Sequence, residues 1–161
     1  MVVSLEQVKQ DPEVQCFIEI ANEHLDKMGY TEHSFRHVDL VAEKAREILQ
    51  SLQYSDREAE LGAIAGYLHD IGNVICRFNH NQTGALLAYN ILKKLGMESR
   101  EIGPIIGAIG NHDEGQGQIV NFITAALVLA DKTDVQRERV RNKDFSTFDI
   151  HDRVNFAVKS S

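Results

Sequence analysis

Residues 63–72 read Ala-Ile-Ala-Gly-Tyr-Leu-His-Asp-Ile-Gly, an apolar run of small and large side chains that leads directly into a histidine and an aspartate. The run fits a helix that is buried in a protein core. A carboxylate at the end of such a helix costs several kcal/mol unless a partner compensates its charge. His69 and Asp70 are therefore candidates for metal binding, although an ordinary polar helix end before Gly72 has the same appearance.

Working outward from this stretch, apolar residues recur at helical spacing along most of the chain. Gly29 offers a C-terminal stop for one segment, and Ser55 with Glu58 forms a capping-box pattern at the start of another. We expect an all-α bundle of six or seven helices without strands. The predicted segments are Asp11 to Met28, His33 to Leu52, Ser55 to Gly72, Gln82 to Leu95, Ser99 to Asn111, Ile119 to Thr133 and His151 to Val158.

The overall composition is that of a globular protein. The chain has 161 residues, of which 43% are apolar and 25% charged, and this length suffices for one domain with a core of its own. Proline occurs only twice, whereas a β-sandwich would need more turn residues. A single domain over residues 1–161 is the expectation.

The charge and the apolar pattern restrict the partners. A net charge of −7 argues against nucleic acid, but it permits a small anionic substrate if a metal ion supplies positive charge locally. The first ten residues lack a signal-peptide pattern, and the apolar run from Ile119 to Ala130 is too short to span a bilayer. Cys16 and Cys76 stand alone, which is typical of reduced thiols. A cytoplasmic protein that does not insert into membranes is expected.

Further histidines and one aspartate lie at the ends of the predicted helices. Asp131 follows the apolar residues 125–130, so it is either a buried carboxylate in need of a partner or the point where the helix reaches solvent beside Lys132. Imidazole and carboxylate together suit divalent iron, manganese, zinc and similar ions. The candidate metal ligands are His37, His69, Asp70, His80, His112 and Asp131.

These residues resemble the HD-domain metal-dependent phosphohydrolases. The order of His37, His69-Asp70 and Asp131 matches the H…HD…D pattern of that superfamily, and His80 and His112 match the two extra histidines of its two-metal branch. The local motifs agree: residues 69–72 read HDIG, residues 80–85 fit H-x-x-x-G-A, and residues 129–132 read LADK. The resemblance covers roughly residues 33–134.

The resemblance implies a specific centre. Two divalent ions, iron or manganese, would share a hydroxide that attacks phosphorus, with Asp70 bridging the two and acting as the catalytic residue. One ion would be held by His37, His69, Asp70 and Asp131, and the other by Asp70, His80 and His112. The implied activity is hydrolysis of a phosphate ester or phosphoanhydride in a small, nucleotide-like substrate.

One departure from the family pattern concerns substrate binding. Many members have lysine after HDxG, near the substrate phosphate, whereas this chain has Asn73. The positive charge must then come from elsewhere, and Lys132 and Arg137 are the candidates, with Arg139 and Arg141 beyond them. The arginines equally fit a solvated face among acidic residues.

Three questions stay open. The same ligand set occurs in HD-type di-iron oxygenases, and a non-catalytic regulatory domain that keeps its metals is a third reading. His33 lies one turn before His37 and either faces the same cavity or is exposed. The last predicted helix, which contains His151, ends near the end of the sequence and leaves open whether two chains pair as a homodimer.

Overall fold

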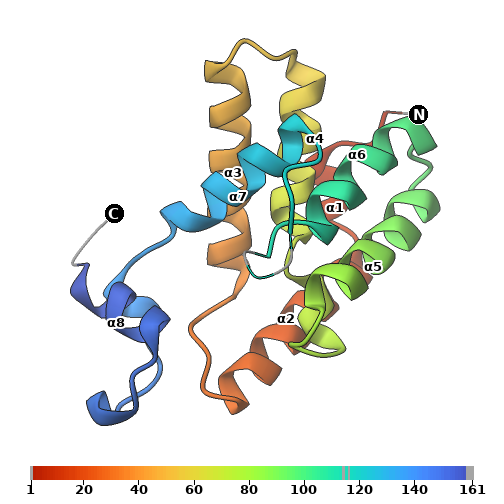
Figure 1. The fold of residues 1–161 in the computed structure, drawn as a ribbon. Helices are drawn as coiled ribbons and strands as arrows, with labels where there is room; N and C mark the ends of the chain where they lie inside the picture. The colour runs from red at the N-terminus through yellow and green to blue at the C-terminus, as the bar shows by residue number, and fades with distance from the viewer. Residues whose placement is uncertain (1, 114, 116, 159–161) are drawn as a thin grey trace.

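The structure is a computed structural model that describes residues 2–113, 115 and 117–158. Over those residues it contains eight α-helices, three short 3-10 helices and no strand, which confirms the predicted all-α bundle (Figure 1). The α-helices are α1 (Leu5–Lys9), α2 (Pro12–Lys27), α3 (Phe35–Ser51), α4 (Asp56–Leu68), α5 (His80–Lys94), α6 (Ser99–Gly110), α7 (Phe122–Thr133) and α8 (Ile150–Ala157); the 3-10 helices are η1 (Ile71–Val74), η2 (Arg137–Arg139) and η3 (Phe145–Thr147).

Most helix ends lie close to their predicted positions. Seven predicted segments correspond to α2 through α8, and the Ser55–Glu58 capping box begins α4 as expected. The additional helix α1 is only five residues long, too short for an apolar period to reveal it. Helix α7 begins three residues later than predicted because the Asn121 side chain accepts the Thr124 backbone N–H, at 2.8 Å, and so caps the helix there.

Helices α3 and α4 form an antiparallel pair at the centre of the molecule, and α7 packs against both (Figure 1). Gly66 allows this close packing. A Cβ at that position would lie 2.8 Å from the Ala42 Cα and 2.9 Å from the Val41 carbonyl oxygen. A larger residue would therefore separate the two helices that carry His37 and His69.

The end of α4 differs from the prediction. The helix stops at Leu68, and Asp70 precedes the 3-10 turn η1 instead of continuing the helix to Gly72. Gly72 contacts the first turn of α5, where a Cβ would overlap the His80 carbonyl oxygen and the Gly84 nitrogen. This approach of two backbones, which only glycine permits, places His80 beside Asp70.

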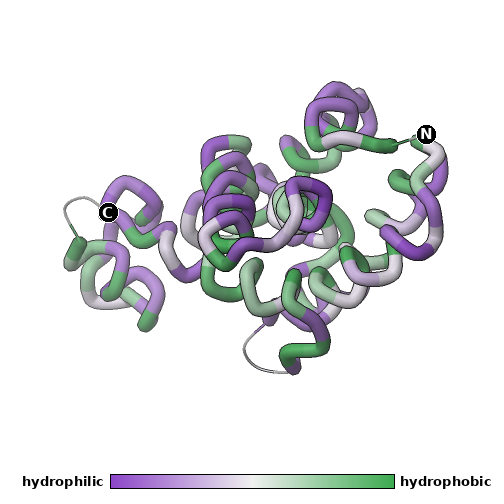
Figure 2. The backbone as a smooth tube through the Cα atoms, turned by 90° about the horizontal axis from the view of Figure 1, so that it is seen from above, coloured by the Kyte–Doolittle hydropathy of each residue, from purple (hydrophilic) through white to green (hydrophobic). Residues whose placement is uncertain are grey.

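The apolar core lies among α1 to α7, and α8 belongs to a C-terminal segment that extends from one side of the bundle (Figure 2). Helix α7 is buried on one side only: Leu129 is 58% exposed, whereas Ile123, Leu127 and Ala130 are fully buried. Within the described residues, no helix has the length and apolar character needed to cross a membrane.

Candidate metal centre

The six predicted ligands come together although they lie on five separate parts of the chain. His37 lies on α3, His80 is the first residue of α5, and His112 follows the end of α6. His69 and Asp70 end α4, while Asp131 lies in the last turn of α7. The four histidines and Asp70 are buried, and the Asp131 side chain is 20% exposed.

Each histidine is held in one orientation by its Nδ1 atom. A carbonyl or carboxylate oxygen accepts a hydrogen bond, so the ring nitrogen facing it carries a proton, and in the neutral ring the Nε2 atom then has a free lone pair. The Nδ1 contacts are His37 to Asp134 Oδ2 at 2.7 Å, His69 to Gly66 O at 2.8 Å, His80 to Arg77 O at 3.1 Å and His112 to Ile109 O at 2.7 Å.

The two oxygens of Asp70 face different pairs of histidines. Oδ2 lies 3.3 Å from His69 Nε2 and 3.7 Å from His37 Nε2. Oδ1 lies 3.3 Å from His80 Nε2 and 3.8 Å from His112 Nε2. One carboxylate thus joins two groups of nitrogen ligands.

The Nε2 atoms within each pair also face one another. They are 3.4 Å apart between His37 and His69, and 3.2 Å apart between His80 and His112. Lone pairs at these distances repel unless a proton or a metal ion lies between them. Asp131 Oδ1 completes the first group at 3.4 Å from His37 Nε2 and 3.7 Å from His69 Nε2. Imidazole with carboxylate is a donor set that suits divalent transition metals, so these residues fit such ions.

The charges of the cluster are strongly coupled. Burial lowers the pKa of His69, but the nearby carboxylates of Asp70 and Asp131 outweigh it and raise that pKa to about 9. Burial, together with His69, lowers the pKa of His112 to about 4. Burial would raise the pKa of Asp70, yet the charge of His69 holds it well below its usual range. The carboxylates of the centre are therefore ionised, whereas the His69 ring holds a proton at neutral pH that a bound metal ion would replace.

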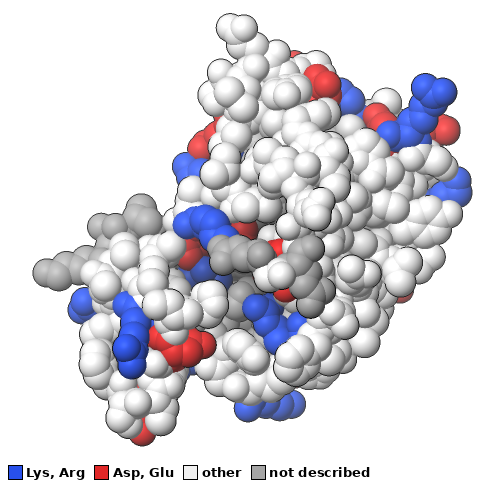
Figure 3. All heavy atoms as spheres, viewed as in Figure 1, with Lys and Arg blue, Asp and Glu red and all other residues white. Residues whose placement is uncertain are grey.

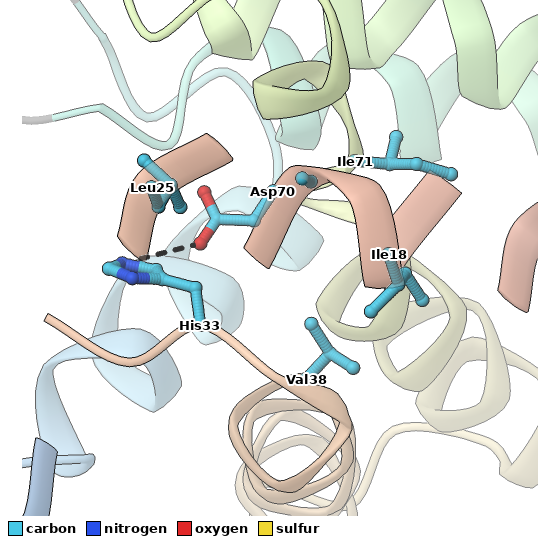
Figure 4. Close-up of a pocket in the computed structure, with 7 residues that line it drawn as sticks. Ile18, Leu25, His33, Val38, Asp70 and Ile71 are labelled. Atoms are coloured by element: carbon cyan, nitrogen blue, oxygen red, sulfur yellow. Dashed lines mark ion pairs between the residues drawn. The ribbon is translucent and has the colours of Figure 1, made fainter. Parts of the chain in front are cut away.

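His33 belongs to the same site, which settles one of the open questions from the sequence. Its Nε2 lies 3.6 Å from Asp70 Oδ2 and its Nδ1 lies 2.6 Å from the Thr31 carbonyl oxygen (Figure 4). Burial lowers the pKa of His33 to about 3, so the ring is neutral. In the sequence, the position of His33 one helical turn before His37 was the feature that indicated a place in the same cavity.

Asp134 also belongs to the surroundings of the cluster, although it was not among the site residues predicted from the sequence. The side chain is fully buried and accepts hydrogen bonds from His37 and from both terminal nitrogens of Arg36, at 3.0 and 2.9 Å. The Nε atom of Arg139 lies 3.3 Å from its Oδ2. Burial opposes its charge, but His37 and the two arginines hold the pKa of Asp134 below its usual range. In the sequence, only its position three residues after Asp131 indicated that Asp134 lies near the cluster.

The predicted substrate-binding residues occupy three different environments. Asn73 is buried, and its Nδ2 donates to Asp70 O at 2.9 Å and Asp70 Oδ1 at 3.1 Å, so it orients the carboxylate. Lys132 lines the cavity over the cluster, with its Nζ 3.3 Å from Asp131 Oδ2. Arg137 is not brought to the cluster: its guanidinium lies over the Phe156 ring, and its Nε donates to the Phe156 carbonyl at 2.8 Å.

Two connected cavities open beside the centre. The first, of about 260 Å³, is lined by His33, Asp70, Arg77, His80, His112, Asp113, Gly115, Asp131, Lys132 and His151. The second, of about 440 Å³, shares five of these residues and extends to α8, with Tyr30, Ile150, Asp149 and Asp152 among its lining. Figure 3 shows basic and acidic side chains gathered where the C-terminal segment meets the bundle. Behind Asp70 the wall is apolar, from Ile18, Leu25, Val38 and Ile71 (Figure 4).

A helical bundle with a buried cluster of histidines and aspartates at the meeting point of its helices is an all-α domain with a candidate site for divalent metal ions. The HD domain family model matches residues 30–144, and the chain belongs to the HD domain family. The match includes all six clustered ligands, His33 and Asp134, whereas α8 lies outside it.

A relative from Methanocaldococcus jannaschii, described as an uncharacterized protein, is 28% identical over 155 residues. The alignment covers 82% of this chain and 59% of the relative, so the chain spans about three fifths of that protein's length. No solved structure matches the chain significantly.

Proposed function

We propose that this protein is a metal-dependent phosphohydrolase whose centre holds two divalent ions, iron or manganese. The observation that carries the proposal is the position of Asp70, whose two carboxylate oxygens each face a separate pair of histidine Nε2 atoms. One bridging carboxylate between two groups of nitrogen ligands is the arrangement that a binuclear site needs.

The residues divide into two groups for this purpose. His37, His69, Asp131 and one oxygen of Asp70 would hold one ion; His80, His112 and the other oxygen of Asp70 would hold the second. Two bound ions supply an activated water molecule and a clamp for the phosphoryl oxygens. The chain fixes the ligands through their Nδ1 contacts, and Asn73 fixes Asp70.

The cavities indicate the substrate class. Arg77 and Lys132 line both cavities and provide positive charge at the entrance to an otherwise acidic centre. The second cavity adds the carboxylates of Asp149 and Asp152, which would repel further phosphate groups. We therefore propose a phosphate monoester whose remaining part is uncharged and of nucleoside size, in preference to a polyphosphate chain.

The test combines metal analysis with a substrate panel. Protein purified without added metal, and protein reconstituted anaerobically with iron or manganese, would be assayed for phosphate release from monoesters, diesters and anhydrides. Asp70→Asn keeps the shape of the side chain but removes its charge, and we expect it to abolish turnover. Asp39→Asn, on the exposed face of α3, is the matched control and should retain activity.

Two other outcomes would replace the proposal. Oxygen uptake with a diol or hydroxyphosphonate, without phosphate release, would identify a di-iron oxygenase that uses the same ligands. Bound metal that raises thermal stability, together with no turnover on the full panel, would identify a non-catalytic regulatory domain.

A further inference from the structure

We infer that Arg77 binds the phosphate group of the substrate at the entrance to the centre. This inference rests on the proposed function and names the residue that recognises the anion. Arg77 lies in the short connection between η1 and α5, and its side chain borders both cavities beside the cluster. It therefore stands between the metal ligands and the space available for the rest of a substrate.

The guanidinium of Arg77 contacts two uncharged side chains, those of Tyr30 and Asn73. It lies over the Tyr30 ring, 5.2 Å from the centroid, and one terminal nitrogen is 3.4 Å from Asn73 Oδ1. In the described part of the chain no carboxylate forms an ion pair with it. The aromatic ring orients the planar group while most of its N–H donors stay available.

Other arginines of the chain differ in this respect. Arg36 and Arg139 pair with Asp134, Arg46 pairs with Glu60, and Arg57 pairs with Glu101. Arg137 and Arg153 instead donate to backbone carbonyl oxygens of the C-terminal segment. Arg77 alone combines a place in the lining of both cavities with the absence of a carboxylate partner, among the arginines for which the structure gives contacts.

Arginine at this place suits a phosphate oxyanion. Its planar fork donates two parallel hydrogen bonds to a phosphate, an interaction that lysine cannot reproduce. The backbone of Arg77 also contacts the cluster, because its carbonyl oxygen accepts a hydrogen bond from His80 Nδ1 at 3.1 Å. The backbone of Arg77 is thereby tied to His80, and the side chain of Arg77 lines both cavities.

A purely structural role for Arg77 makes a different prediction. If the side chain only braces its loop against Tyr30, its removal would disturb His80 and lower the metal content. If it binds phosphate, its removal would leave the metal content unchanged and weaken anion binding. The two roles are separated by measuring both quantities on the same variants.

The experiment uses inorganic phosphate as the probe with the full, metal-loaded chain. Binding would be measured by calorimetry for the wild type, Arg77→Ala and Arg77→Lys, with Arg100→Ala as the control on the exposed start of α6. We expect Arg77→Ala to weaken phosphate binding by about 10- to 100-fold, the usual range for a lost charged hydrogen bond. Arg77→Lys should recover part of this loss, and Arg100→Ala should match the wild type.

Because phosphate binding does not depend on turnover, the outcomes separate the two proposals. Phosphate binding that depends on Arg77 in a protein that hydrolyses no substrate would leave the inference standing and overturn the phosphohydrolase. Hydrolysis by the wild type, together with unchanged phosphate binding in Arg77→Ala, would support the phosphohydrolase and overturn the role of Arg77. Loss of metal in parallel with loss of phosphate binding, or no phosphate binding by the wild type, would overturn the role of Arg77.

Discussion

The Nδ1 atom of His37 lies 2.7 Å from the Oδ2 atom of Asp134, and both side chains are completely buried. Since a carboxylate accepts the Nδ1 proton, the Nε2 atom of His37 keeps its lone pair toward the cluster. Arg36 and Arg139 hold Asp134 from its other sides. Asp134 therefore fixes both the tautomer and the direction of a candidate ligand without being one of the six clustered residues itself.

The first prediction concerns Asp134→Asn. The amide has the shape of the carboxylate but not its charge, so Arg139 loses its anionic partner, Arg36 keeps only Glu32, and His37 is oriented less firmly. We expect metal affinity to fall by about 10- to 100-fold, the usual effect of losing such a partner. Calorimetric titration of the metal-free protein with metal measures this affinity. Asp26→Asn, a carboxylate exposed beside Arg141, is the control, and equal affinities in the two variants would contradict the role of Asp134.

The second prediction separates the two halves of the centre. His112→Ala removes a ligand from the group that includes His80, whereas His37, His69 and Asp131 stay in place. We expect the metal content to fall from about two ions per chain to about one, because only one group loses a nitrogen donor. Elemental analysis after anaerobic reconstitution measures this, with His24→Ala on α2 as the control. Retention of both ions in His112→Ala would exclude this division of ligands.

The third prediction concerns the contact between α3 and α4. Gly66→Ala places a methyl group against the Ala42 backbone, and rigid backbone cannot move aside cheaply. We expect the free energy of unfolding to fall by about 1–3 kcal/mol, as for other overpacked sites. Gly107→Ala on α6 is the matched control: its Cβ would meet only Asn121 Nδ2 at 3.5 Å and Val120 Cγ2 at 3.7 Å, which are ordinary contact distances, so it should gain about 0.5–1 kcal/mol from helix propensity. Denaturant unfolding of both variants measures the two changes in the free energy of unfolding. Changes of the same sign would contradict the prediction.

The fourth prediction is a pH dependence that involves no cluster residue. Arg57 holds the Glu101 carboxylate through two hydrogen bonds, of 2.6 and 2.5 Å, and so lowers the pKa of Glu101 below its usual value of 4.5. A lowered folded-state pKa gives stability that is present above the unfolded pKa and lost as the pH falls through the folded value. For this partly exposed pair the contribution is at most about 1 kcal/mol.

Glu101→Gln should therefore be less stable than the wild type at neutral pH, and the difference should shrink toward the lowest pH at which both proteins stay folded. Denaturant unfolding in the presence of a chelator would measure it, so that acid-induced loss of metal does not contribute. The ion pair between Arg46 and Glu60 is present in both the wild type and Glu101→Gln, so the difference between the two proteins reports on Glu101 alone. A difference independent of pH would assign the effect to packing.

The sequence was sufficient for the parts of this structure that depend on local patterns. Apolar spacing predicted seven of the helices, and the HD motif predicted which six side chains would meet. The end of α4 was predicted wrongly because the contact of Gly72 with α5 is made across the chain and leaves no local pattern. The burial of Asp134 likewise depends on Arg36 and Arg139, which reach it from distant positions.

Substrate contacts were the least predictable part. Arg137 carries the right charge close to Asp131 in sequence, but the Phe156 ring and carbonyl oxygen hold it in the C-terminal segment. Arg77 was not a candidate, since nothing in its neighbourhood marks it, and only the fold brings it to the cavities. The position of a long charged side chain depends on tertiary contacts that periodicity does not report.

The last prediction concerns the number of phosphates in the substrate. Of the four aspartates that line the second cavity, Asp134 is paired with Arg36 and Arg139, and Asp131 lies 3.3 Å from Lys132 Nζ. The other two, Asp149 and Asp152, would lie beside any phosphate beyond the one at the centre, and their negative charge disfavours its binding. We expect a nucleoside monophosphate to be hydrolysed with at least about tenfold higher kcat/KM than the corresponding triphosphate, and the ratio to narrow at high ionic strength because salt screens the repulsion. Phosphate release from the two nucleotides, with free metal buffered to the same level, measures the ratio; equal or faster hydrolysis of the triphosphate would show that the acidic lining does not select the substrate.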